Sequence, residues 1–107
     1  MGLDTMQELT TGNFRETIKN GNAIIDFWAP WCGPCRMMAP IFEESAKGHS
    51  NILFAKLNVD EHGEIAQELG IRSIPTVIFF KNGQEVNRYV GAMTKPQLES
   101  RVKDNFG

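Results

Sequence analysis

The strongest constraint on the fold is an apolar run, Ala23–Trp28, that is followed at once by strand-breaking and helix-starting residues. Both alternating faces of this run are apolar apart from Asp26, which is the pattern of a strand inside a sheet that is covered on both sides. Pro30 ends the strand. Pro34 suits the first turn of a helix, where its missing N–H costs nothing, and the residues after it are helix-like as far as Lys47. The sequence therefore predicts a buried strand that turns directly into a helix.

Two cysteines, Cys32 and Cys35, lie at this turn, and the chain has no others. Four consecutive residues at the start of a helix can bring two sulfurs together so that a disulfide closes. A helix N-terminus also stabilises a thiolate through its partial positive charge and free N–H groups. Cys32 is the expected nucleophile and Cys35 the expected resolving thiol. The alternative is half of a zinc site, but zinc takes four ligands and only His49 and His62 remain, both expected to be solvated.

The composition is that of an ordinary globular protein, with 107 residues of which 41% are apolar and 22% charged. The net charge is −2 and the basic residues are scattered, so neither nucleic acid nor a membrane surface is an expected partner. The N-terminus lacks the basic segment and apolar core of a signal peptide. We expect one domain over residues 1–107, a monomer, in the reducing cytoplasm, although an organelle form without its targeting segment would look the same.

Periodicity and turn signals predict an alternation of helices and strands along the chain. In order, the predicted elements are a short edge strand or a loop over 3–9, a helix over 13–19 capped by Asn13, a strand over 23–29, the helix to 47, a strand over 52–59, a helix from Asp60 to Leu69 closed by Gly70, strands over 76–80 and 85–90, and a helix capped by Thr94. Helical crossovers imply parallel pairing early on, whereas Asn82-Gly83 predicts an antiparallel hairpin. The expected fold is α/β, with a mixed central sheet of about five strands flanked by four helices.

Short motifs along nearly the whole chain carry a family resemblance. They are Asp26-Phe27-Trp28-Ala29, Trp31-Cys32-Gly33-Pro34-Cys35, Pro40, Ala55-Lys56-Leu57-Asn58-Val59-Asp60, Gly70-Ile71-Arg72-Ser73-Ile74-Pro75-Thr76, Phe80-Lys81-Asn82-Gly83 and Val90-Gly91-Ala92. With these motifs the chain resembles the thioredoxin family. A lone C-x-x-C is weak, because zinc sites and isomerases share it, but its combination with the apolar strand and the later Ile-Pro-Thr is specific. Arg36 stands where many members have lysine, which keeps the charge.

The resemblance implies an enzyme that reduces protein disulfides through the Cys32/Cys35 dithiol. Gly33 and Pro34 between the cysteines go with reductases in families that resemble this one. No bound cofactor is implied, because the dithiol itself carries the two electrons. Recycling is expected from a partner reductase, either dependent on flavin and NADPH or dependent on ferredoxin. Two other classes stay open, namely an oxidising or isomerising enzyme on the same fold and a binding module whose redox state is irrelevant.

A carboxyl in an apolar strand is unusual, and burial of Asp26 is expected to raise its pKa because desolvation disfavours the charge. The resemblance implies that Asp26 lies beneath the cysteines and relays a proton to or from Cys35. Lys56, on an adjacent strand of the implied fold, is the expected counter-charge. The alternatives are an Asp26 satisfied by structural hydrogen bonds and a Lys56 that is simply exposed.

The resemblance also implies a substrate-binding rim beside the cysteines. Only about 5–6% of X–Pro bonds in folded proteins are cis, yet the family pattern implies a cis bond before Pro75. Ile74 is then expected to offer its backbone to an extended substrate peptide, as in strand addition. Trp31, Ile74, Gly91 and Ala92 are expected to form the apolar part of the rim.

Overall fold

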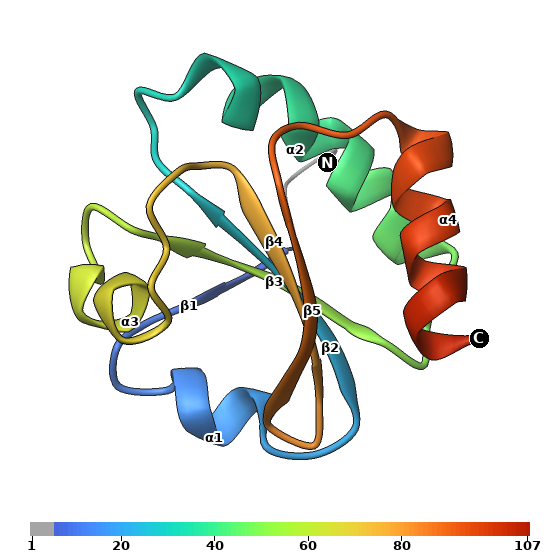
Figure 1. Cartoon of the computed structure of the whole chain (residues 1–107), viewed down its shortest axis with the longest axis horizontal. Coiled ribbons are helices and arrows are strands. Elements are labelled where there is room, and N and C mark those ends of the chain that lie inside the picture. Colours follow the sequence, from blue (N-terminus) through green and yellow to red (C-terminus); the bar gives the residue numbers. More distant parts are fainter. Residues whose placement is uncertain (1–5) are drawn as a thin grey trace.

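The computed structural model describes residues 6–107, which form a five-stranded sheet in the order β1-β3-β2-β4-β5 with helices on both faces (Figure 1). The elements are β1 (Gln7–Leu9), α1 (Phe14–Ile18), β2 (Asn22–Trp28), α2 (Gly33–Lys47), β3 (Leu53–Asn58), α3 (Gly63–Glu68), β4 (Thr76–Lys81), β5 (Gln84–Val90) and α4 (Lys95–Phe106). β1, β3 and β2 pair in parallel, whereas β4 is antiparallel to both β2 and β5. The predicted element order and mixed sheet are confirmed. None of these helices is long and apolar enough to span a bilayer.

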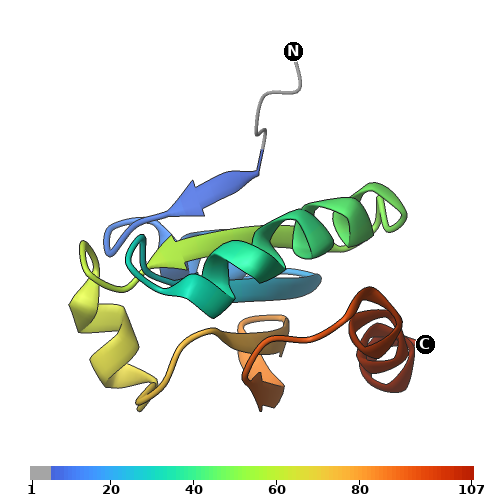
Figure 2. The same cartoon turned by 90° about the horizontal axis from the view of Figure 1, so that it is seen from above.

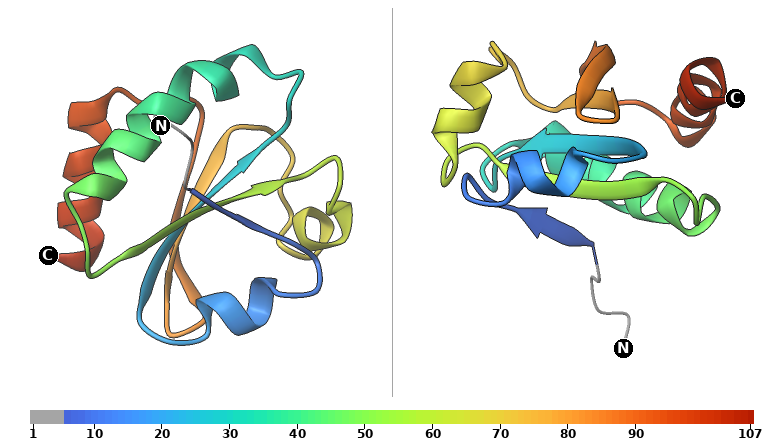
Figure 3. Two further views of the ribbon diagram at one scale, coloured as in Figure 1. Left: turned by 180° about the vertical axis from the view of Figure 1, so that it is seen from behind. Right: turned by 90° about the horizontal axis from the view of Figure 1, so that it is seen from below.

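The sheet divides the core into two layers, with α1 and α3 on one face and α2 and α4 on the other (Figure 2; Figure 3). Because side chains alternate along a strand, Ile25 and Phe27 of β2 pack with the α1 and α3 layer, whereas Ile24 packs with the α2 and α4 layer. Asp26 is two residues from Ile24 and therefore points to the face that α2 covers. β3 alternates in the same way, since Ala55 and Phe54 lie in different layers.

The central strand β2 leads directly into the helix that carries the cysteines. Residues 23–27 are all buried, because β3 and β4 flank β2 and helices cover both of its faces. The chain leaves the sheet after Trp28, and α2 begins at Gly33 with Cys32 as its N-cap and Pro34 in its first turn. Gly48 is the C-cap. The predicted strand, turn and helix are therefore confirmed.

Turn chemistry is confirmed at three places. Gly70, just after α3, has φ +70°, and Asn82 and Gly83 in the β4–β5 hairpin have φ +51° and +84°. Thr94, the predicted cap, accepts a hydrogen bond from the Gln97 N–H, and the Gln97 side chain accepts one from the Thr94 N–H, which together form a capping box. These local signals fix the ends of α3, β4 and α4.

Of the predicted helix caps, Asn13 holds its position without a capping hydrogen bond, and Asp60 is wrong. Asn13 occupies the N-cap position of α1, but its side chain accepts a hydrogen bond from the Thr10 N–H at 2.8 Å instead of one from the helix. α3 begins at Gly63 with His62 as N-cap, so Asp60 does not cap it. The Asp60 N–H is bound by the Asn58 side chain at 2.9 Å, which holds Asp60 in a turn ahead of the helix. The short edge strand is confirmed for Gln7–Leu9, and residues 3–5 lie outside the described part of the chain.

Candidate active site

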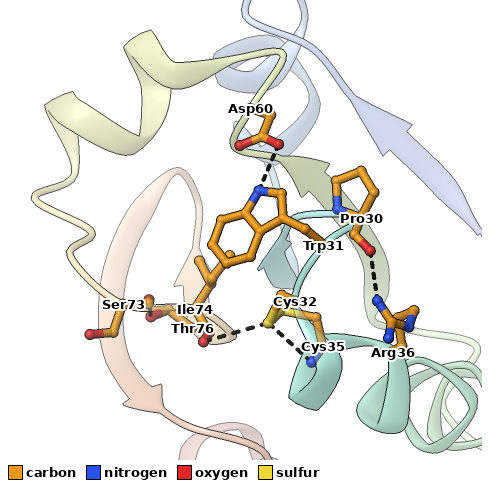
Figure 4. Close-up of a disulfide and its surroundings, with 9 residues drawn as sticks. All are labelled: Pro30, Trp31, Cys32, Cys35, Arg36, Asp60, Ser73, Ile74 and Thr76. Atoms are coloured by element: carbon orange, nitrogen blue, oxygen red, sulfur yellow. Dashed lines mark hydrogen bonds between the residues drawn. A yellow bond between two sulfur atoms is a disulfide. The ribbon is translucent and has the colours of Figure 1, made fainter.

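Cys32 and Cys35 form a disulfide at the N-terminus of α2, with their Cα atoms 5.2 Å apart (Figure 4). Cys32 is the N-cap, and the Cys35 N–H donates to Cys32 Sγ over 3.3 Å. Cys32 is 5% exposed and Cys35 2%, so Cys32 is the more accessible of the two buried residues. The positive end of α2 therefore points at the sulfur of Cys32, where it stabilises negative charge.

The loop before β4 lies against this disulfide. The Ile74–Pro75 bond is cis, as the resemblance implied, and the Ile74 carbonyl oxygen lies 3.8 Å from Cys32 Sγ (Figure 4). The Gly91 N–H donates to the Pro75 carbonyl over 2.8 Å, which brings the turn after β5 alongside the proline. Gly91 has φ +104°, a conformation that favours glycine. The loop before β4 thus contacts Cys32, and the turn after β5 contacts that loop.

Trp31 forms the exposed edge of the site. Its side chain is 67% exposed, and its Nε1–H donates to Asp60 Oδ2 over 2.8 Å, which fixes the indole beside the Ile74 loop (Figure 4). A hollow of about 160 Å³ lies against the indole and is lined by Trp31, Val59, Ala66, Ile71, Arg72, Ser73 and Ile74. Sequence reasoning missed Asp60 as a site residue, because an aspartate before a short helix is also a common helix cap.

A second apolar hollow, of about 190 Å³, adjoins Ala92. It is lined by Met37, Met38, Ile41, Ala92, Met93, Thr94 and Gln97. Met37 is 73% exposed although it is a large apolar residue. From the sequence, Met37 and Met38 are expected to be core or surface filler, because methionine fills both in many contexts.

Asp26 is buried on β2 and ionises near neutral pH. Asp26 is 2% exposed, and burial raises the pKa of its carboxyl from 3.8 to about 7. The charge of Lys56 lowers this pKa, and the charge of Glu8 raises it by a smaller amount. Asp26 Oδ1 accepts no hydrogen bond from any residue in 6–107. Trp28, two residues further along β2, packs against the cysteine cluster. Asp26 thus lies on the sheet face that carries the disulfide.

Lys56 is the residue on β3 that is in register with Asp26, as the resemblance implied. Its side chain is 13% exposed, and its Nζ lies 5.1 Å from the centroid of the Trp28 ring and 3.6 Å from Glu8 Oε2. The alternative of an exposed Lys56 is therefore wrong. The sequence did not predict the contact between Glu8 and Lys56, because the strand that carries Glu8 is too short and poorly patterned to predict its register.

The two histidines lie away from the cysteines. His49 follows the C-terminal end of α2, and its Nε2 lies 2.8 Å from Glu99 Oε1, while its ring stacks on Phe54 at 5.9 Å. His62 Nδ1 accepts from the Thr11 N–H over 3.1 Å. The expectation that His49 is simply solvated is wrong. Among residues 6–107 there is no group of three or more histidine, cysteine or acidic side chains arranged to hold a metal ion.

Comparison with known proteins gives a consistent result. A family model described as Thioredoxin matches residues 5–104. The thioredoxin of Alicyclobacillus acidocaldarius is 49% identical over 98 residues, which cover 90% of this chain and 93% of that protein, and the thioredoxin of Pyropia yezoensis is 43% identical over 101 residues, covering 92% and 94%. The oxidised crystal structure of mitochondrial thioredoxin 3 from Saccharomyces cerevisiae has a TM-score of 0.86 and 37% identity, and the match covers 94% of this chain and 95% of that one. With its cysteine pair oxidised at the start of α2, the chain belongs to the thioredoxin family and is a thiol–disulfide oxidoreductase that reduces protein disulfides without a bound cofactor.

Proposed function

We propose that Cys32 attacks the substrate disulfide and that Cys35 resolves the complex. The Cys32 thiolate forms a bond to one substrate sulfur, and the other substrate sulfur leaves as a thiolate that takes up a proton. The Cys35 thiolate then attacks Cys32 Sγ and releases the second substrate thiol. The substrate gains two electrons and two protons, and Cys32–Cys35 is left as the disulfide. The observation that carries the assignment is the 3.3 Å hydrogen bond from the Cys35 N–H to Cys32 Sγ, because this bond stabilises negative charge on Cys32.

Asp26 is the group that takes the proton from Cys35 in the second step. Its pKa of about 7 supports this role, since a general base works best when its pKa is near the operating pH. Lys56, in register on β3, favours the ionised carboxylate and so tunes that pKa. Gly33 and Pro34 tune the redox behaviour of the cysteines, because Pro34 fixes the first turn of α2 and Gly33 presents no side chain to the substrate.

The substrate binds across Trp31, Ile74, Pro75, Gly91 and Ala92 as an extended peptide. The exposure of Trp31 supports this, as does the hollow between Trp31 and the Ile74 loop. An extended segment that pairs with the Ile74 backbone would bring its own disulfide close to Cys32, whose sulfur is 3.8 Å from the Ile74 carbonyl. The rim is apolar, so it would favour apolar side chains beside the substrate disulfide.

Disulfide-containing proteins are the substrates, and a reductase restores the dithiol, as the family implies. We assign this chain to the cytoplasm, as a single-domain monomer recycled by a reductase that uses flavin and NADPH. Ferredoxin-dependent recycling is the second candidate, since the chloroplastic M-type thioredoxin of Pisum sativum is 53% identical over 81 residues, which cover 75% of this chain and 47% of that protein. The small net charge of the present chain, −2, supports neither nucleic acid nor a membrane as a partner.

Trapping the mixed disulfide tests the cysteine roles. The Cys35→Ser variant is expected to accumulate a covalent complex with a disulfide-bonded protein, and the Cys32→Ser variant is expected to form none. Mass spectrometry of samples kept free of reducing agent measures the complex. A complex formed by Cys32→Ser alone would reverse the assignment. The reduction potential of the pair gives the direction of the reaction: a value well below that of the glutathione pool supports a reductase, and a value at or above it supports an oxidase or isomerase.

A further inference from the structure

Three charged residues form a row across three neighbouring strands. Glu8 on β1 is in register with Lys56 on β3, and Lys56 is in register with Asp26 on β2. Residues in register on adjacent strands project to the same face, so the three side chains share the face that α2 covers. Glu8 Oε2 lies 3.6 Å from Lys56 Nζ. Lys56 therefore lies between Glu8 on the edge strand and the Asp26 carboxyl that we propose as the base.

The row runs from solvent to the interior of the protein. The Glu8 side chain is 48% exposed and that of Lys56 13%, while Asp26 is 2% exposed. The neighbour of Asp26 on β4 is the apolar Val77, and α2 has no acidic residue in its first turn. The Arg36 guanidinium of α2 donates to a backbone carbonyl over 2.9 Å. Within residues 6–107, Lys56 thus lowers the pKa of Asp26 and Glu8 raises it.

We propose that Glu8 is a positioning residue for the thiol chemistry, which draws Lys56 Nζ toward β1 and so limits how strongly the lysine charge acts on the Asp26 carboxyl. The ammonium group ends a flexible four-carbon stem, so an acidic partner at the sheet edge decides where its charge rests. Held at that edge, Lys56 leaves Asp26 able to keep a proton at neutral pH and to release it. This inference rests on the proposed role of Asp26 as the proton acceptor.

Glu8→Gln tests the proposal, because it removes the charge and keeps the size of the side chain. Strands lie about 4.8 Å apart, so Glu8 and Asp26 are separated by roughly 10 Å, and a unit charge at that distance changes a pKa by about 0.3 to 1. Because the loss of the Glu8 charge also frees Lys56 to approach Asp26, we expect the pKa of Asp26 to fall by more than twice that amount. NMR titration of the Asp26 carboxyl carbon in the disulfide form measures it without interference from thiols. Glu16→Gln is the matched control, because Glu16 pairs with Lys19 at 3.8 Å on α1, and it should leave the Asp26 titration unchanged.

A second background separates positioning from direct repulsion. In Lys56→Met, the Glu8→Gln substitution should move the pKa of Asp26 by less than half as much as it does with Lys56 present. An equal shift in both backgrounds would overturn the positioning role, because Glu8 would then act as a distant charge alone. An unchanged Asp26 titration in Glu8→Gln would overturn the proposal outright, and a loss of thermal stability without a pKa change would mark Glu8 as structural.

The proton relay itself is tested separately with Asp26→Asn. If that variant reduces disulfides with the same pH dependence as the original protein, the relay is wrong, whatever Glu8 does to the pKa of Asp26. If Asp26→Asn changes the pH profile and Glu8→Gln moves neither that profile nor the Asp26 titration, the relay stands and the role of Glu8 falls. The conservative variant Glu8→Asp should restore part of the Asp26 pKa.

Discussion

Replacing Asp26 with asparagine is expected to stabilise the protein above neutral pH. The folded protein holds the Asp26 proton up to a pKa of about 7, whereas the unfolded chain loses it near the ordinary value of 3.8. Between these two values the folded state binds the extra proton, so the free energy of unfolding falls as the pH rises, and above about pH 7 the full loss is reached. A difference of about 3 in pKa, at about 1.36 kcal/mol each, makes this loss about 4 kcal/mol.

Urea unfolding of the disulfide form, from about pH 4 to about pH 9, measures this effect. The asparagine side chain does not ionise, so the stability of the variant relative to the original protein should increase by about 4 kcal/mol across this range, with most of the change complete by about pH 7. The pH dependence that both proteins share cancels in the difference. The buried amide adds a cost that does not depend on pH. Asp104→Asn, at an exposed position of α4, is the control and should show no such trend. Equal pH dependence in Asp26→Asn and the original protein would refute the raised pKa.

Two further substitutions test the site and the fold. Trp31→Ala removes the exposed indole that donates a hydrogen bond to Asp60. It should raise KM for protein disulfides roughly tenfold with a smaller effect on kcat, because an aromatic side chain buried by a bound partner contributes about 1–2 kcal/mol. A fall in kcat alone, measured by steady-state kinetics, would contradict this. Thr94→Ala removes half of the α4 capping box and should lower the free energy of unfolding by about 1 kcal/mol, with Thr94→Ser close to the original protein in the same urea assay; equal stability of all three proteins would show that the cap contributes nothing.

Local signals account for most of what the sequence predicts correctly. The run that becomes β2 is apolar on both faces, and as a strand it is buried on both only inside a sheet that is covered on each side. Pro34 and Gly48 mark the two ends of the next helix to within one turn. The Asn82-Gly83 pair fixes the hairpin because both residues take positive φ. The cysteine spacing predicts the site itself, since its geometry is contained in four residues.

The errors share one physical cause, which is that a polar side chain binds whichever partner the tertiary structure supplies. Asp60 has the sequence position of a helix cap, but the Trp31 indole, 29 residues away, donates to its carboxylate. His49 has the position of a solvated loop residue, but Glu99 lies 2.8 Å from its ring. The pairing of Glu8 with Lys56 depends on the register of a three-residue strand, which pairing with β3 determines and composition does not.

The energetic cost of Asp26 bears on its function. A loss of about 4 kcal/mol is a large part of the roughly 5–15 kcal/mol that stabilises a typical domain. Within residues 6–107 no hydrogen bond to Oδ1 offsets it, and Ile24, two residues earlier, covers the same face of β2 without such a cost. A structural role would be served better by an uncharged side chain, so the stabilised Asp26→Asn variant should also be the slower enzyme at the step in which Cys35 resolves the mixed disulfide. Stopped-flow measurement of that step decides the matter: an Asp26→Asn protein that is both more stable and equally fast would show that Asp26 has no part in the chemistry.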